Sequence, residues 1–267
     1  MVEKFKEFLT HSNMAKNTVS AYIYAVNDFN SRYKELTKKN LLLYKTYLIE
    51  RFKPKTVNLR IQALNKYLEY LHKPKLRLKS VKVQQRTYLE NVISQADYIF
   101  LKKKLKQEEN LMWYFVVRFL TATGARVSEL IQIKVEHVRI GYFDIYSKGG
   151  KVRRLFIPKC LRVEAEKWFE ETQQTTGYIF RNRFGERITT RGIAQQLKNY
   201  AERYGLNTNV VYPHSFRHRY AKNFLDAFND IALLADLMGH ESIETTRIYL
   251  RRTASEQQAI VDKVITW

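Results

Sequence analysis

Hydrophobic residues in the first 72 positions recur at the spacing of an α-helix. Segment 17–29 (NTVSAYIYAVNDF) places its apolar residues on one helical face, with Asn17 or Thr18 as the expected N-cap. Segment 55–71 repeats apolar residues at intervals of four and three, with a proline before it and another after it. The segments VEKFKEFL and LLLYKTYLIERF add two more helices. The pattern therefore predicts a bundle of four helices in residues 1–72. The apolar positions of the two longer segments are Val19, Tyr22, Ile23, Val26 and Phe29, and Val57, Ile61, Leu64, Leu68 and Leu71.

The pattern changes after residue 90. Ser94 is the expected cap of a helix, and the apolar run LMWYFVVRFLTATG predicts a buried helix that ends at Gly124. Segment 142–157 alternates apolar and polar residues around SKGG, which predicts a β-hairpin. A short strand is expected at GYIFRN, followed by a turn at RFGER. Further helices are expected at 159–172, 190–204, 215–226 and 229–238.

Segment 73–86 (KPKLRLKSVKVQQR) has six basic residues, no acidic residue and no clear period. It is interpreted as a linker, and its charge would also suit contact with a phosphate backbone. The expected organisation is a helical domain at 1–72, a basic linker at 73–90 and a second domain with a C-terminal tail at 91–267. The fold class is mainly α with a small β-sheet (α+β).

The charge of the chain adds a candidate partner. Its 267 residues contain 47 Lys and Arg against 26 Asp and Glu, a net charge of +21. Residues 1–90 hold 19 basic and 7 acidic residues, so the first third is the denser in positive charge. This balance favours a nucleic acid, while a solvated basic surface is the plainer alternative. No apolar run approaches the roughly 18 residues of a membrane span, so no membrane partner is expected.

The cysteine content and the N-terminus bear on the cellular compartment. Cys160 is the one cysteine, so an intrachain disulfide is impossible and a reducing, intracellular setting fits. The start MVEKFKEFL does not resemble a signal peptide. No Cys/His cluster has zinc spacing, and no Asp/Glu cluster suited to magnesium stands out. We therefore expect no metal and no cofactor.

Four segments carry candidate chemistry: TGARVSEL, SKGGKVRR, HSFRH and GHESIETTRIY. Each is ordinary when taken alone, since a helix-start arginine is usually a surface residue and the tyrosine is one of 18. Together they hold what a metal-free attack on a phosphodiester requires: cations for the phosphate oxygens, a proton donor and a nucleophile. Arginine suits the first task because its planar fork binds two oxygens and stays charged. The candidate residues are Arg126, Lys148, His214, Arg217, His240 and Tyr249.

In this order and at these separations the four segments resemble the tyrosine recombinase, or phage integrase, family. The resemblance covers about residues 94–250, and the N-terminal helices are similar to the core-binding domain of that family, which is SAM-like. It implies a tyrosine-recombinase catalytic domain that forms a clamp on DNA with the helical domain. The chain shows no additional N-terminal arm-binding domain, which favours a simple, Xer-like, two-domain member.

The resemblance also implies a role for each residue. Tyr249 would attack the scissile phosphate and form a 3′-phosphotyrosyl bond, while Arg126 and Arg217 would hold the nonbridging oxygens. Lys148 would protonate the leaving 5′-oxygen. His214 would exchange a proton, with the tyrosine as the expected partner, and His240 would hydrogen-bond the phosphate. Two further assignments are less specific: Glu129 would orient Arg126, and Lys151 competes with Lys148 for the lysine role, because SKGGK replaces the more usual GKGxK.

The implied function is site-specific recombination of double-stranded DNA, in integration, excision or dimer resolution. The resemblance implies a homotetramer on two DNA sites, with an accessory or second recombinase protein as a further candidate partner, in the cytoplasm and at the nucleoid. Two alternatives stay open: a non-catalytic DNA-binding protein on the same scaffold, and DNA relaxation like that of a type IB topoisomerase. The tail RRTASEQQAIVDKVITW has apolar residues at helical spacing. It would pack either on its own domain or on a neighbouring subunit.

Overall fold

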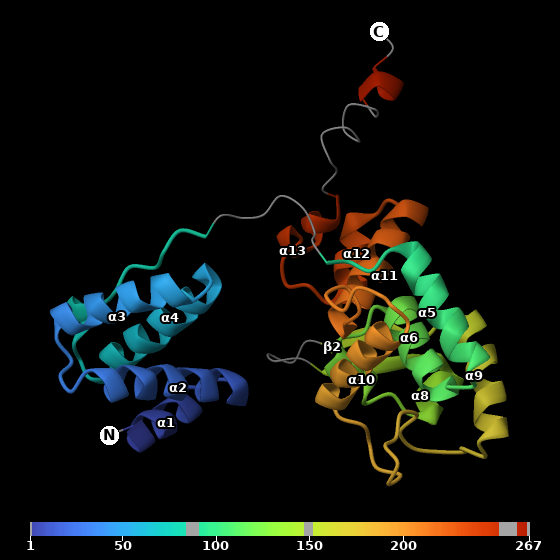
Figure 1. The fold of residues 1–267 in the computed structure, drawn as a ribbon, viewed down its shortest axis with the longest axis horizontal. Helices are drawn as coiled ribbons and strands as arrows, with labels where there is room; N and C mark the ends of the chain where they lie inside the picture. The colour runs from blue at the N-terminus through green and yellow to red at the C-terminus, as the bar shows by residue number, and fades with distance from the viewer. Residues whose placement is uncertain (1, 84–90, 147–151, 251–260, 266–267) are drawn as a thin grey trace. The chain divides into compact units, whose positions relative to one another are not determined.

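The computed structural model describes residues 2–83, 91–146, 152–250 and 261–265. The chain divides into two compact units, residues 1–85 and residues 86–267 (Figure 1). Helices dominate both units, and the described residues contain one two-stranded antiparallel sheet. The prediction of a mainly helical fold with a small sheet is confirmed.

The first unit consists of four α-helices and one 3-10 turn. Its core is formed by apolar faces of all four helices, together with Leu78. One partly buried polar group connects three of the helices: the Asp28 carboxylate accepts hydrogen bonds from the Tyr44 hydroxyl at 2.6 Å and from Arg60 Nη1 at 2.7 Å. The elements are α1 Val2–His11, α2 Lys16–Arg32, α3 Lys38–Arg51, α4 Pro54–Tyr70 and η1 Pro74–Leu76.

The starts of these helices show where local sequence decides the boundary. Thr37 caps α3, because its hydroxyl accepts a hydrogen bond from the Asn40 amide at 3.2 Å. The expected cap of α2 is wrong: the helix begins at Lys16, so Asn17 and Thr18 lie inside its first turn. Its N-cap is Ala15, whose backbone is extended and whose side chain offers no acceptor.

The second unit holds the remaining elements. The predicted cap at Ser94 and the helix end at Gly124 are both confirmed: Ser94 Oγ accepts from the Asp97 amide at 2.9 Å, and Gly124 follows α6 with φ of 63°. The elements are α5 Gln95–Gln107, α6 Leu111–Thr123, α7 Val127–Leu130, α8 Val135–Ile140, β1 Tyr142–Tyr146, β2 Val152–Phe156, α9 Lys159–Glu171, α10 Thr190–Arg203, α11 Pro213–Ala227, α12 Ile231–Met238, α13 Glu244–Arg247 and η2 Ile248–Leu250.

Of two β-structures predicted from the sequence, the structure contains one, the hairpin. The predicted hairpin is present, with β1 and β2 paired from Tyr142 opposite Phe156 to Tyr146 opposite Val152. The strand predicted at GYIFRN is wrong: the segment makes only two isolated bridges, Lys134 with Tyr178 and Arg181 with Arg187. Each bridge pairs a single residue, so no ladder extends along the segment.

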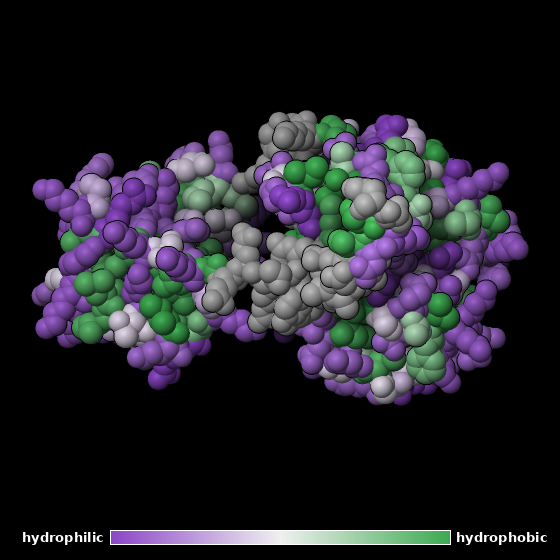
Figure 2. Space-filling view, turned by 90° about the horizontal axis from the view of Figure 1, so that it is seen from above, coloured by the Kyte–Doolittle hydropathy of each residue, from purple (hydrophilic) through white to green (hydrophobic). Residues whose placement is uncertain are grey.

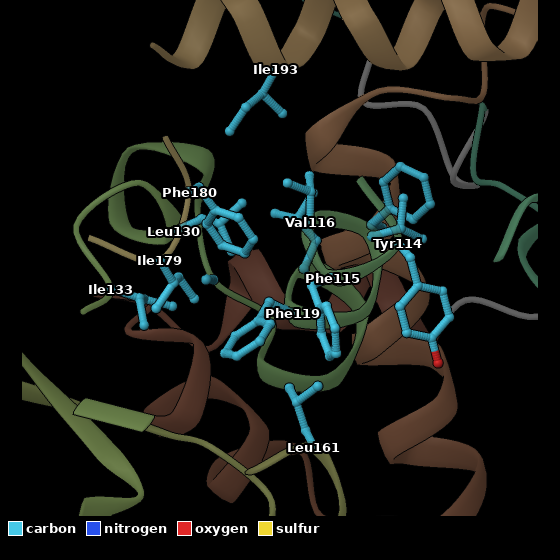
Figure 3. Close-up of a cluster of buried hydrophobic side chains, with 14 of the residues drawn as sticks. Tyr114, Phe115, Val116, Phe119, Leu130, Ile133, Leu161, Ile179, Phe180 and Ile193 are labelled. Carbon is cyan, nitrogen blue, oxygen red and sulfur yellow. The ribbon is translucent and has the colours of Figure 1, made fainter. Parts of the chain in front are cut away.

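Helix α6 lies at the centre of the core of the second unit. Phe115 and Phe119 are almost fully buried, and Phe115 stacks on Trp168 of α9 at 4.6 Å between ring centroids. Figure 3 shows the α6 aromatic rings in a cluster with side chains from other elements, among them Leu161, Phe180 and Ile193. A second, smaller apolar cluster joins α11, α12 and the segment after α12, and consists of Ala221, Leu225, Leu234, Met238 and Tyr249.

The segment that enters the second unit is fixed to the start of α11. The Ile93 amide donates to Ser215 Oγ at 2.7 Å, and the Ile93 carbonyl accepts from Arg219 Nε at 2.8 Å. Ile93 and Ser215 are fully buried. The first turn of α11 is therefore held by backbone contacts from a part of the chain more than 120 residues away.

The surface is polar over most of both units. In the face drawn in Figure 2, hydrophilic residues cover most of each unit and hydrophobic residues form separate patches. No helix in the described part of the chain is long and apolar enough to span a membrane. Within the C-terminal tail the structure describes residues 261–265, where Val261, Val264 and Ile265 are exposed by about half. The docking of the tail on either its own or a neighbouring subunit thus remains a prediction.

Candidate active site

Five of the six predicted site residues lie close together in the second unit. Helix α11 carries His214 and Arg217, and Arg126 is the N-cap of the short helix α7. His240 follows α12 after one glycine, and Tyr249 lies in η2. The sixth candidate, Lys148, and its competitor Lys151 lie outside the described residues.

Arg217 lies at the centre of the group and is 2 % exposed. Its guanidinium donates to the carbonyls of Gly124 and Met238, the latter at 2.6 Å, and lies 3.3 Å from His240 Nε2. Burial, together with the nearby cations Arg126 and Arg153, lowers the pKa of Arg217 to about 10. The side chain is still charged at neutral pH, so the site contains a cation whose charge favours a bound anion.

The hydrogen-bond partners of His240 determine its tautomer. Arginine can only donate, so His240 Nε2 accepts from Arg217 and the ring proton lies on Nδ1. That proton is donated to Thr246 Oγ1 at 2.7 Å, and Thr246 is fully buried. Burial lowers the pKa of His240 to about 4, helped by Arg217, Arg126 and Arg153. The imidazole is therefore neutral at pH 7 in the absence of an anion.

Arg126 is oriented by a carboxylate on its own helix turn. Glu129 Oε1 accepts from Arg126 Nη1 at 2.8 Å, and Glu129 Oε2 accepts from the Arg126 amide at 2.7 Å. A third hydrogen bond joins Arg126 Nη2 to the Gly239 carbonyl at 3.1 Å. Of the Arg126 side chain 39 % is exposed, so this guanidinium is accessible where Arg217 is buried.

Arg153 of β2 is a member of the site that the sequence did not single out. Its guanidinium donates to Glu129 Oε2 at 2.5 Å and to the Leu237 carbonyl at 2.7 Å. The side chain is 10 % exposed and Glu129 is 6 % exposed, so the pair is buried. Arg153 thus joins the hairpin to both Glu129 and the α12 end. Its position two residues after Lys151 in an alternating strand was the available signal.

Two glycines of the motifs are required by close contacts. Gly124 has φ of 63°, and a Cβ there would lie 2.4 Å from Cδ1 of Tyr220. Gly239 has φ of 61°, and a Cβ there would lie 2.3 Å from Cδ of Arg153. Both conformations lie in the left-handed region, which favours glycine. The carbonyls of these two residues also accept hydrogen bonds from Arg217 and Arg126.

Tyr249 is 8 % exposed, and its hydroxyl is paired with a histidine that the sequence interpretation did not select. The hydroxyl lies 2.8 Å from His218 Nδ1. His214 is exposed, and its ring centroid lies 5.3 Å from that of His218. Burial raises the pKa of Tyr249 to about 12, and burial lowers the pKa of His218 to about 4. The pair is therefore a neutral phenol beside a neutral imidazole at pH 7.

The described residues contain no group of three or more His, Cys, Asp or Glu side chains placed to hold a metal ion. The site contains three cations, Arg126, Arg153 and Arg217, and one nearby carboxylate, Glu129. A phosphate bound beside Arg126 and Arg217 would meet the neutral Tyr249 hydroxyl and two neutral histidines. This combination suits nucleophilic attack on a phosphodiester.

Comparison with known proteins extends over both units. Residues 85–256 match the phage integrase family, and residues 1–82 match the phage integrase N-terminal SAM-like domain. The chain is 27 % identical over 275 residues to tyrosine recombinase XerA of Pyrococcus furiosus, which covers 98 % of this chain and 93 % of the relative. It is 26 % identical to tyrosine recombinase XerD of Listeria monocytogenes over 95 % of this chain and 94 % of the relative.

Solved structures share the fold at low identity. A lambda integrase dimer bound to a COC′ core site matches with a TM-score of 0.74 and 15 % identity, covering 100 % of this chain and 77 % of that chain. The Tn1549 transposon integrase in complex with transposon right end DNA matches with a TM-score of 0.73 and 12 % identity, covering 98 % of both chains. The site-specific recombinase XerH bound to its difH substrate matches with a TM-score of 0.69 and 16 % identity, covering 98 % of this chain and 84 % of that chain.

Proposed function

The chain belongs to the phage integrase family, and from this membership we propose that it is a tyrosine-type site-specific DNA recombinase. It cuts and rejoins DNA strands through a 3′-phosphotyrosyl intermediate on Tyr249. The partner is double-stranded DNA, which the similar XerH, Tn1549 and lambda proteins bind in their structures. The net charge of +21 supports the same partner, because basic residues release counterions from the phosphate backbone.

The observation that carries the proposal is the cluster in which Arg217 contacts His240 and lies close enough to the Tyr249 phenol to affect its pKa. Arg126 and Arg217 hold the nonbridging oxygens. His240 donates a hydrogen bond to the phosphate once Nε2 is released from Arg217 and takes up a proton. A bound phosphate raises the pKa of His240, because its negative charge offsets the repulsion from the arginines. Lys148 protonates the leaving 5′-oxygen, and His214 takes part in proton exchange. Glu129 orients Arg126 through the two hydrogen bonds described above.

The reaction conserves the energy of the phosphodiester. The P–O5′ bond breaks as the bond from Tyr249 to phosphorus forms, and the 5′-hydroxyl of a partner strand later reverses the step. Recombination needs two sites and two strands of each, so a homotetramer on DNA is the proposed assembly. An accessory or second recombinase is a further proposed partner. The protein would act on nucleoid DNA in the cytoplasm.

The test begins with the identity of the DNA. Sequencing of DNA that is covalently linked to the protein in cells gives the target site. A duplex of that sequence, nicked beside the cleavage point so that religation is blocked, then traps the intermediate. We expect wild-type protein to form a covalent adduct and Tyr249→Phe to form none, while both bind the duplex with similar affinity. Binding without any wild-type adduct would instead favour the non-catalytic alternative.

A second duplex assay separates recombination from simple relaxation. Two labelled duplexes that carry the site are incubated with the wild-type protein, and exchanged products are resolved by size. Exchange of strands between the duplexes supports recombination. Relaxation of a supercoiled plasmid without exchange would support the topoisomerase-like alternative.

A further inference from the structure

We propose that His218 is a catalytic residue: it is the general base that accepts the proton of the Tyr249 hydroxyl during cleavage. The inference rests on the proposed function, and it moves this proton from His214 to a residue four positions later on α11. The observation behind it is the 2.8 Å hydrogen bond between Tyr249 Oη and His218 Nδ1.

The geometry favours His218 over His214 for this step. His218 contacts the reacting oxygen directly, and its ring centroid lies 5.6 Å from that of Tyr249. His214 is exposed, and its ring centroid lies 5.3 Å from that of His218. The basic atom must lie within about 3.2 Å of the heavy atom that carries the proton. The contact between His218 Nδ1 and Tyr249 Oη meets this condition. His214 is then free to contact the phosphate or the leaving group instead of the tyrosine.

The protonation states are those that a base and its substrate need. We assign the proton to the Tyr249 oxygen, so that the hydroxyl donates and Nδ1 accepts. The groups that face His218 are His214 and Arg217 on α11, and His240 in the loop after α12. Together with burial they hold the pKa of His218 to about 4, which keeps its nitrogen free to accept a proton at pH 7. The titratable and charged groups that face the phenol are Tyr212 and Arg217.

Substrate binding strengthens this base. A phosphate between Arg126 and Arg217 adds negative charge close to His218, which offsets the repulsion from Arg217 and His240. The pKa of His218 then rises, and the imidazolium that forms on proton transfer is stabilised by the phosphate. The nucleophile is therefore activated mainly when the scissile phosphate is in place.

As Tyr249 Oη bonds to phosphorus, its proton passes to His218 Nδ1. The P–O5′ bond breaks, and its electron pair leaves with O5′, which takes a proton from the general acid Lys148. In the return step a 5′-hydroxyl gives its proton to the neutral amine of Lys148 and attacks phosphorus. The bond to Tyr249 breaks, and the phenolate oxygen recovers the proton from His218.

The experiment measures single-turnover adduct formation on the nicked duplex, at saturating protein and between about pH 6 and pH 8. The variants are His218→Asn, which can still accept a hydrogen bond but not a proton, and His218→Ala with and without added imidazole. His11→Gln on the exposed end of α1 is the matched histidine control. DNA affinity is measured for each variant, so that only variants that bind as the wild type does are compared.

We expect His218→Asn to slow adduct formation by about 10²-fold or more at pH 7, the range of general base catalysis. Its rate should rise by about tenfold per pH unit, because only the ionised phenol reacts without a base. The wild-type rate should stay nearly constant over the same range, and imidazole should accelerate His218→Ala.

Three results would overturn the proposal. An unchanged rate in His218→Asn would show that no base acts there, and a faster rate would show that His218 restrains the tyrosine. A wild-type rate that rises about tenfold per pH unit would contradict it without any variant. In each case the wild-type adduct still forms, so these results differ from failure of the proposed function, in which no adduct forms.

Discussion

Replacement of Glu129 by glutamine tests the charge balance of the site. The carboxylate is 6 % exposed and accepts from Arg153, which is 10 % exposed, at 2.5 Å. Removing one partner of a buried ion pair costs about 3–5 kcal/mol, and glutamine keeps one acceptor oxygen. The Arg126 pair adds less than about 1 kcal/mol, because 39 % of that side chain is exposed. We therefore expect Glu129→Gln to lower the free energy of unfolding by about 2–4 kcal/mol.

Tryptophan fluorescence during urea denaturation is a suitable assay. All three tryptophans lie at positions 113, 168 and 267, so the signal reports on the second unit alone. Trp168 is buried against Phe115, which makes its emission sensitive to unfolding of the core. Because the fluorescence comes from one unit, the measured transition reports the unfolding of that unit alone. Probes that report on both units would superimpose two unfolding transitions.

Glu164→Gln provides the matched control. Glu164 also pairs with an arginine, Arg118, at 3.0 Å in the same unit, but the two side chains are 27 % and 19 % exposed. We expect this change to cost only about 1–2 kcal/mol. A loss below about 1 kcal/mol in Glu129→Gln, or a loss no larger than that of Glu164→Gln, would refute the argument that burial makes the Glu129 pair costly to break.

Three further predictions follow from the same site. Arg126→Ala should slow adduct formation by about 10²–10³-fold while DNA affinity changes little, because the clamp acts on charge that develops in the transition state; equal losses in both assays would contradict this. Gly239→Ala should destabilise the second unit more than Gly205→Ala, by tryptophan fluorescence: both have positive φ, but a Cβ meets Arg153 only at Gly239, and nothing lies within 4 Å at Gly205. Acidification should destabilise the second unit between about pH 6.5 and pH 4, since the pKa values of His218 and His240 are lowered and the unfolded chain binds more protons there. Each histidine should contribute a loss of about 1–2 kcal/mol by pH 5, and a stability that stays constant over this range in the wild type would contradict the assigned neutral states.

The periodicity of apolar residues predicted most of the helices, because the local sequence determines where a long helix has an apolar face. The residues predicted for the helix at 55–71 are buried from Val57 to Leu68, and the α6 helix ends at Gly124 where the left-handed conformation stops it. The start of the short helix α7 was anticipated at Arg126, whereas α8 was not predicted, since six residues do not complete a recognisable period. The strand expected at GYIFRN failed because its pairing depends on distant partners such as Lys134.

The sequence identified residues of the candidate site only where they belong to a motif with a fixed order of residue types. Arg126, His214, Arg217, His240 and Tyr249 were found in this way, and they lie together in the second unit. Arg153 and His218 were missed for a physical reason: their importance comes from contacts across 24 and 31 positions of the chain, with Glu129 and Tyr249. Spacing along one helix or strand does not show which distant residue a side chain contacts.

The chemical identity of the linkage between protein and DNA is the most direct test of covalent catalysis by Tyr249. The adduct formed on the nicked duplex is digested with trypsin and nuclease, and the DNA-linked peptide is sequenced by mass spectrometry. Trypsin releases the tyrosine in the short peptide Ile-Tyr-Leu-Arg, residues 248–251. The account predicts a 3′-nucleotide on Tyr249 of this peptide and its loss in Tyr249→Phe. A nucleotide on any other residue, or an adduct that persists in Tyr249→Phe, would contradict it.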